Sequence, residues 1–167
     1  MGERICVSSG QPSAHHAPPG QKQIDESELR RVCGHFATGV TVVTFRGFTG
    51  ISGVTVNSFT SVSLDPPLIL FCLRKDSSSL PALERSRSFA VNFLTDRQEA
   101  LARMFASRNR PPAEEVTRHW TREEVPILSK SLAFLTCRLV DKKSGGDHVI
   151  ILGEVVELGV QEEPASL

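Results

Sequence analysis

Two segments of the sequence gather side chains that could hold a polar ligand. Residues 53–67 read GVTVNSFTSVSLDPP, so an apolar run ends in a dense series of hydroxyl and amide groups before a rigid Pro-Pro turn. Residues 145–148 read GGDH, a flexible loop that delivers one histidine to the start of another apolar run. By themselves these patterns also fit an ordinary polar loop, with Asn57 in an Asx-turn, and a histidine that only satisfies local hydrogen bonds.

Signatures of several other site types are absent from the sequence. There is no GxGxxG between a strand and a helix, no GxxxxGK[ST], no GxSxG and no HExxH, which removes the main support for Rossmann, P-loop, hydrolase and zinc-protease functions. Gly47, Gly50 and Gly53 are interpreted as turn and bulge residues. The four cysteines, Cys6, Cys33, Cys72 and Cys137, have neither CxxC nor zinc-finger spacing. We therefore expect buried free thiols and no metal site.

The charge balance limits the possible partners. Nineteen Lys and Arg residues equal nineteen Asp and Glu residues, so no field favours nucleic acid or an acidic membrane surface. Residues 74–110 are locally basic, with eight Lys or Arg against four Asp or Glu. A phosphate-bearing ligand could use two or three of these cations, although most of them fit solvated helix faces.

The hydrophobic pattern predicts a mainly β fold with peripheral helices. Six β-branched or aromatic runs predict strands at 38–45, 51–59, 67–73, 89–94, 132–140 and 148–158. A helix is expected from Asp25, a short one after Ser78–Ser79 that ends near Arg87, and another that opens at Asp96 with Glu99 as its capping partner. Strands that follow one another without a helix, at 38–73 and 132–158, are expected to pair antiparallel and to close into a barrel.

One domain is expected, with a tail at each end. Residues 1–24 are rich in Ser, Pro, Gly and Gln and are interpreted as a disordered arm. Residues 25–160 form the expected domain and 161–167 a C-terminal tail. No stretch approaches the roughly 18 apolar residues of a membrane span, and no secretory h-region is visible, so a cytoplasmic location is expected.

Five motifs occur in the order and spacing of a known family. They are FATGVTVVT at 36–44, TVNSFTSVSLDPPLILFCL at 55–73, SFAVNFL at 88–94, LARMFASR at 101–108 and GDHVIILGEV at 146–155. This series resembles the flavin reductase-like family, from about Leu29 to Val156, and segment 109–126 departs from the family pattern. The resemblance implies an antiparallel, Greek-key FMN-binding split β-barrel that is homodimeric.

The resemblance also implies site residues. The flavin ring would lie against Thr55, Val56, Asn57, Ser58 and Ser61. The flavin phosphate region would lie against Cys72, Lys75, Ser77, Ser78 and Ser79, and against Phe105, Ala106, Ser107 and Arg108. His148 would bind NADH, with Asp147 ordering the loop. No catalytic side chain is expected, because a nicotinamide can pass hydride from C4 directly to flavin N5 when the two rings are aligned.

The implied function is an NAD(P)H-dependent flavin reductase that supplies diffusible FADH2 or FMNH2 to a separate monooxygenase. FAD is slightly favoured over FMN, and NADH over NADPH. Three alternatives stay open at this stage: a split-barrel oxidase with tightly held FMN, a non-catalytic flavin carrier or sensor, and a structural barrel that binds nothing.

Overall fold

The computed structural model describes residues 24–107, 116–121 and 123–160, and the chain separates into two units, Met1–Ala37 and Thr38–Leu167. The first unit contains helix α1, Glu26–Cys33. Its N-cap is the predicted Asp25, whose carboxylate accepts a hydrogen bond from the Glu28 N–H at 3.0 Å. Most of the predicted arm, and residues 161–167, lie outside the described part of the chain.

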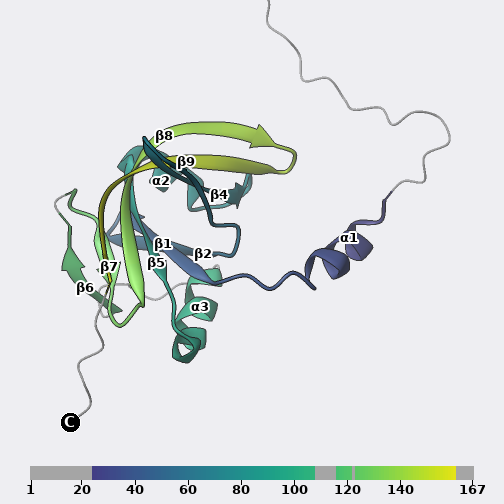
Figure 1. Cartoon of the computed structure of the whole chain (residues 1–167), viewed down its shortest axis with the longest axis horizontal. Helices are drawn as coiled ribbons and strands as arrows, with labels where there is room; N and C mark the ends of the chain where they lie inside the picture. Colours follow the sequence, from purple (N-terminus) through teal and green to yellow (C-terminus); the bar gives the residue numbers. More distant parts are fainter. Residues whose placement is uncertain (1–23, 108–115, 122, 161–167) are drawn as a thin grey trace, which may run out of the picture. The chain divides into compact units, whose positions relative to one another are not determined.

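The second unit is built on an antiparallel sheet (Figure 1). Its strands are β1 Thr41–Arg46, β2 Ile51–Val56, β3 Thr60–Leu64, β4 Pro67–Arg74, β5 Ser88–Phe93, β8 Ala133–Gly145 and β9 His148–Val160. They pair in the order β2-β1-β5-β8-β9-β4-β3, and β6 Thr117–Trp120 pairs with β7 Pro126–Leu128 in a separate hairpin. The sheet curls until β2 approaches β4, and the barrel is split there. The expected mainly β, antiparallel fold with helices outside the sheet is confirmed.

The curled sheet encloses one main core. β4 alternates, with Ile69, Phe71 and Leu73 buried and their neighbours more exposed. The Phe71 ring meets the Phe89 ring of β5 edge-on, with centroids 5.3 Å apart, a favoured aromatic geometry. Burial of alternate side chains on opposed strands therefore holds the barrel closed everywhere except at the split.

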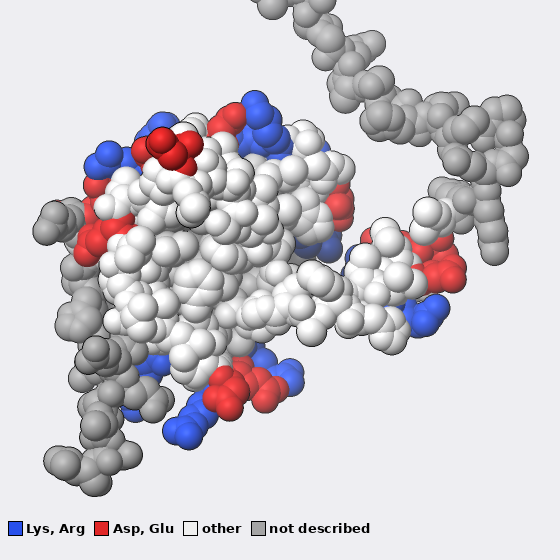
Figure 2. Space-filling view, viewed as in Figure 1, with Lys and Arg blue, Asp and Glu red and all other residues white. Residues whose placement is uncertain are grey.

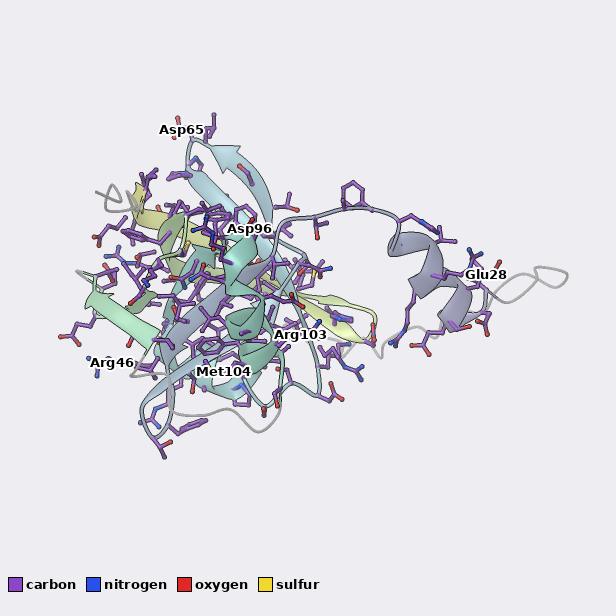
Figure 3. The ribbon with its side chains drawn as sticks, turned by 90° about the horizontal axis from the view of Figure 1, so that it is seen from below. Glu28, Arg46, Asp65, Asp96, Arg103 and Met104 are labelled. Atoms are coloured by element: carbon purple, nitrogen blue, oxygen red, sulfur yellow. The ribbon has the colours of Figure 1, made fainter. Side chains whose placement is uncertain are left out.

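The predicted pairing of segments 51–59 and 67–73 is wrong. β2 ends at Val56, and the chain then forms β3, which pairs with β4. Residues 60–64 look like a polar loop because β3 is an edge strand whose side chains are mostly exposed, so no apolar face marks it. The short strands β6 and β7 were missed because three or four residues hold too little periodicity. Asp65 lies in the turn of the β3–β4 hairpin (Figure 3).

Helix α2, Leu80–Ser86, lies where it was predicted and ends at Arg87 in the left-handed conformation. A 3-10 turn, Asp96–Gln98, leads into α3, Glu99–Ala106. The predicted cap at Asp96 is one residue late. Thr95 is extended and exchanges capping hydrogen bonds with Gln98, and an extended residue is what a cap position needs. Figure 3 shows Asp96 at the start of this segment and Met104 near its end. No helix of the described residues is long and apolar enough to span a membrane.

Gly53 makes the close contact between α3 and β2 possible. It lies inside β2, and a Cβ placed on it would stand 2.6 Å from the Phe105 ring. Gly53 therefore allows α3 to lie close to β2, whereas the sequence analysis interpreted it as a turn or bulge residue. The Phe105 side chain is buried, in a cluster with Val42 and Leu128.

A buried polar network attaches β7 to the sheet. The Asn92 side chain donates to the Val42 carbonyl at 2.9 Å and to the Thr44 hydroxyl at 3.0 Å, and accepts from the Leu128 N–H at 2.9 Å. Thr44 in turn donates to the Pro126 carbonyl at 2.5 Å. Asn92 is completely buried, so each of these bonds replaces a bond to water that the group has lost.

We predict that Asn92→Ala lowers the free energy of unfolding by roughly 2–4 kcal/mol, because it leaves buried donors and acceptors without partners. Urea denaturation followed by circular dichroism measures this loss. Asn57→Ala is the matched control, since Asn57 is exposed, and should change stability by less than about 0.5 kcal/mol. Equal stability of the two variants would contradict this account of the network.

Candidate functional site

A pocket of about 880 Å³ opens where the barrel is split. Its wall comes from the end of β2, the following two residues, the end of β4, the turn after β4, the end of α3 and the start of β9. The lining residues are Val54, Thr55, Val56, Asn57, Ser58, Cys72, Leu73, Arg74, Asp76, Ser77, Ser78, Ala106 and His148. The volume lies within the usual range for sites that bind small molecules and cofactors.

Ser58 joins the two sides of this pocket through Cys72. The Ser58 hydroxyl accepts the Cys72 N–H at 2.9 Å. Cys72 lies on β4, and Ser58 lies in the link that leads from β2 to β3. The side chain of Ser58 thus joins this link to β4 just before the β3–β4 ladder begins at Thr60. This contact positions residues 57–58, at the end of β2, where the flavin ring was predicted to bind.

Thr55 is held by α3. Its hydroxyl donates to the Ala102 carbonyl at 2.6 Å, so the donor capacity of this side chain is used within the protein. The Thr55 oxygen keeps acceptor capacity, and Asn57 adds an exposed amide to the wall. Val54, Val56 and Ala106 supply apolar surface beside these groups. The wall therefore combines an apolar patch with hydrogen-bonding groups, as a flat ring with polar edges requires.

The rim of the pocket is charged. Arg74 of β4 pairs in register with His148 of β9, and the Lys75 N–H donates to the Asp147 carbonyl at 2.9 Å. His148 Nδ1 lies 2.8 Å from an Asp147 carboxylate oxygen. That hydrogen bond, helped by the charges of His148 and Arg74, lowers the pKa of Asp147 below its ordinary value. The Arg74 guanidinium contacts Asp76 through two nitrogens, at 2.9 and 3.1 Å.

Nine of the residues implied by resemblance lie on the pocket wall: Thr55, Val56, Asn57, Ser58, Cys72, Ser77, Ser78, Ala106 and His148. The others in the described part of the chain lie off it. Ser61 is on the exposed edge strand β3, Lys75 and Ser107 are exposed, Ser79 is buried at the start of α2, and Asp147 orders His148. Phe105 is a core residue because Gly53 admits its ring. Arg108 lies outside the described residues.

Four wall residues, Val54, Leu73, Arg74 and Asp76, were missed by sequence reasoning. The sequence signal for Arg74 and Asp76 is an Arg-x-Asp spacing at the end of a strand. This spacing does not distinguish a site from ordinary charged surface residues. Of the Lys and Arg side chains in the basic segment 74–110, Arg74 lies on the pocket wall, as far as the described residues show. Arg85 instead covers the Phe48 ring at 5.3 Å. Over the face of Figure 2, Lys and Arg lie near Asp and Glu around the margin, with an uncharged centre.

The thiols differ from the expectation that all are buried. Among the described cysteines, Cys33 is exposed, Cys72 is half-buried on the pocket wall and Cys137 is buried. Burial raises the pKa of Cys137 to about 12, so this thiol stays protonated and inert. Within the described ranges, no three His, Cys, Asp or Glu side chains are grouped as a metal site requires.

The comparisons with known proteins agree on one family. The family described as flavin reductase like domain matches residues 33–167. The chain is 44% identical over 147 residues to an NADH-dependent FAD reductase of Streptomyces globisporus, covering 84% of this chain and 80% of that protein. It is 40% identical over 134 residues to the reductase component of a 4-nitrophenol monooxygenase of Rhodococcus opacus, covering 80% and 72%.

Solved structures show the same fold. The NADH:FAD oxidoreductase of Streptomyces globisporus, in complex with NAD and FAD fragments, superposes with a TM-score of 0.77 at 40% identity, covering 87% of this chain and 88% of that chain. At this identity, with most of both chains covered, the expected split-barrel architecture is confirmed.

We predict that His148→Ala raises the pKa of Asp147 toward its ordinary value of 3.8, because the largest cause of the lowering is lost. A lowered carboxyl pKa stabilises the fold above the ordinary value, and this contribution disappears as pH falls through the lowered pKa. Carbon-13 NMR of the side-chain carboxyls over an acid titration measures the shift. Asp141, whose pKa is lowered mainly by Lys143, should not respond. An unchanged Asp147 would refute the assigned contact.

Proposed function

This chain belongs to the flavin reductase like domain family, and on that premise we propose that it is an NAD(P)H:flavin oxidoreductase that supplies diffusible reduced flavin. The pocket carries this proposal. It offers hydrogen-bonding groups around an apolar patch, and it contains neither an acid–base triad nor a metal cluster among the described residues. Such a site can align two ring systems and exclude water, which is what hydride transfer needs from a protein.

The pocket residues fit a flavin as substrate. A bound flavin supplies the redox chemistry, since its N5 accepts the hydride that nicotinamide C4 donates. Val54, Val56 and Ala106 provide apolar surface for the ring, while Asn57 and Ser58 stand where a polar ring edge would find partners. Ser77 and Ser78 offer hydroxyls at the other side of the wall for the ribityl and phosphate part.

His148 and Asp147 orient the nicotinamide nucleotide in this proposal. The Asp147 carboxylate lies 2.8 Å from the imidazole nitrogen Nδ1, a contact that favours one orientation of the ring. The backbone bond from Lys75 to Asp147 attaches this loop to the end of β4. His148 therefore acts through binding and orientation, and proton transfer is not assigned to it.

The proposed partners are a separate flavin-dependent monooxygenase and a second copy of the chain. The relative from Rhodococcus opacus is named as the reductase component of a monooxygenase, which supports the first. For the homodimer, Leu158 and Val160 are 69% and 79% exposed on β9, two residues apart, and Leu132 is 55% exposed. Alternate residues of a strand share one face, and an exposed apolar strip suits a symmetric contact. We place the reaction in the cytoplasm, where NADH is formed.

The proposal predicts that NADH oxidation by the purified protein, without oxygen, requires added flavin and accumulates free reduced flavin. The assay follows NADH absorbance and flavin bleaching together, with FAD, FMN or no flavin, and it ranks the two flavins. FAD is expected to be slightly preferred. Tight flavin binding without turnover would overturn the proposal in favour of a carrier, and oxidase activity with flavin that copurifies would favour the FMN oxidase.

His148→Ala should raise the apparent KM for NADH about tenfold and leave kcat within about twofold, because the side chain contributes binding energy rather than a chemical step. Steady-state kinetics at saturating flavin measure both constants. Reduction of bound flavin by dithionite is the control, since it does not use the nucleotide site. A loss of kcat greater than a hundredfold with normal dithionite reduction would assign His148 to the chemical step.

A further inference from the structure

A bidentate ion pair between Arg74 and Asp76 lies on the pocket wall and has no role in the function proposed above. The Arg74 guanidinium contacts both carboxylate oxygens of Asp76, and the two side chains are 56% and 55% exposed. Both residues line the pocket. Arg74 is also the register partner of His148, the residue assigned to the nicotinamide nucleotide. The ion pair therefore lies beside the place where that nucleotide would bind.

The charged side chains around Arg74 are already paired with one another. Arg74 is engaged by Asp76, and the Asp147 carboxylate is engaged by His148, whose hydrogen bond lowers the pKa of Asp147. Even with the His148 imidazole counted as protonated, two cations face two carboxylates. The Lys75 side chain is exposed, and it does not line the pocket. A phosphate group that entered here would have to compete with Asp76 for Arg74.

NADH and NADPH differ only in the 2′-phosphate of the adenosine ribose. A phosphate is bound best by an arginine whose two nitrogens are available to it, whereas a ribose hydroxyl can donate to a carboxylate. We propose that the Arg74–Asp76 ion pair makes this site select NADH over NADPH, because Asp76 occupies the guanidinium that would otherwise bind the 2′-phosphate. This inference rests on the proposed function, and it names the group that sets nucleotide preference.

The first test compares kcat/KM for NADPH and NADH in the wild type, Asp76→Asn, and the double variant Arg74→Gln/Asp76→Asn. Asp76→Asn should raise the NADPH/NADH ratio about tenfold through a lower KM for NADPH, because a charged hydrogen bond becomes available. The double variant should lose this gain, since the gain acts through Arg74. Both residues are exposed, so folding should be preserved. Arg74→Gln alone should lower the ratio below that of the wild type.

Glu99→Gln is the matched control. Glu99 forms an exposed ion pair with Arg103 on α3 (Arg103 is labelled in Figure 3) and does not line this pocket. It removes one negative charge elsewhere on the same unit and should leave the ratio unchanged. A ratio that stays within twofold of the wild type in Asp76→Asn, or that rises only because NADH binds more weakly, overturns the proposal.

A binding measurement separates this inference from the proposed function. Calorimetry with 5′-AMP and 2′,5′-ADP needs no turnover, and Asp76→Asn should bind 2′,5′-ADP about tenfold tighter than the wild type, with the gain shrinking as salt screens the contact. The inference is overturned if Asp76→Asn shows the same preference between the two probes as the wild type. It is also overturned if neither probe binds to any variant. Wild-type protein that prefers 5′-AMP but does not reduce flavin with NADH would refute the proposed function and leave the ion-pair assignment supported.

Discussion

The hydrogen bond from the Cys72 N–H to the Ser58 hydroxyl is the constraint on which the pocket depends. The sheet closes by burying its inner face, yet β2 and β4 do not pair. The side chain of Ser58, which lies two residues after β2, bonds to β4 instead. Because a serine hydroxyl can accept a backbone bond without continuing the strand, the walls are held together while the space between them stays open. The 880 Å³ pocket thus exists because β2 and β4 do not pair and the barrel stays open between them.

The remaining contacts place different parts of the wall around that opening. Thr55 is fixed by α3, and α3 comes close to β2 because Gly53 has no side chain. At the rim, the turn after β4 and the β8–β9 turn are joined by the Lys75–Asp147 backbone bond. On β5, an interior strand of the sheet, Asn92 accepts the Leu128 N–H of β7. These groups hold and shape the wall and do no chemistry themselves, which suits a reaction whose chemistry belongs to its two substrates.

The elements with strong periodicity could be predicted from the sequence, and those without it could not. α1, α2 and six strands were located because apolar residues recur every 3.6 or every two residues, or form β-branched runs. The edge strand β3 was missed because its side chains are mostly exposed and mark no apolar face. The cap of the helical segment 96–106 was predicted one residue late, at Asp96, because Thr95 and Asp96 are both good capping residues. The extended backbone and the capping hydrogen bonds of Thr95 distinguish them.

The sequence by itself determined the fold class and the segments that form the pocket, because ordered motifs over most of the chain constrain both. It also identified nine of the wall residues through resemblance. Only the tertiary structure decided that Phe105 belongs to the core, that Thr55 gives its hydroxyl hydrogen to α3, and that Arg74 and Asp76 meet at the rim. The physical reason is that these outcomes depend on side-chain direction and on register between strands distant in the chain, and neither is encoded in the spacing of any one segment.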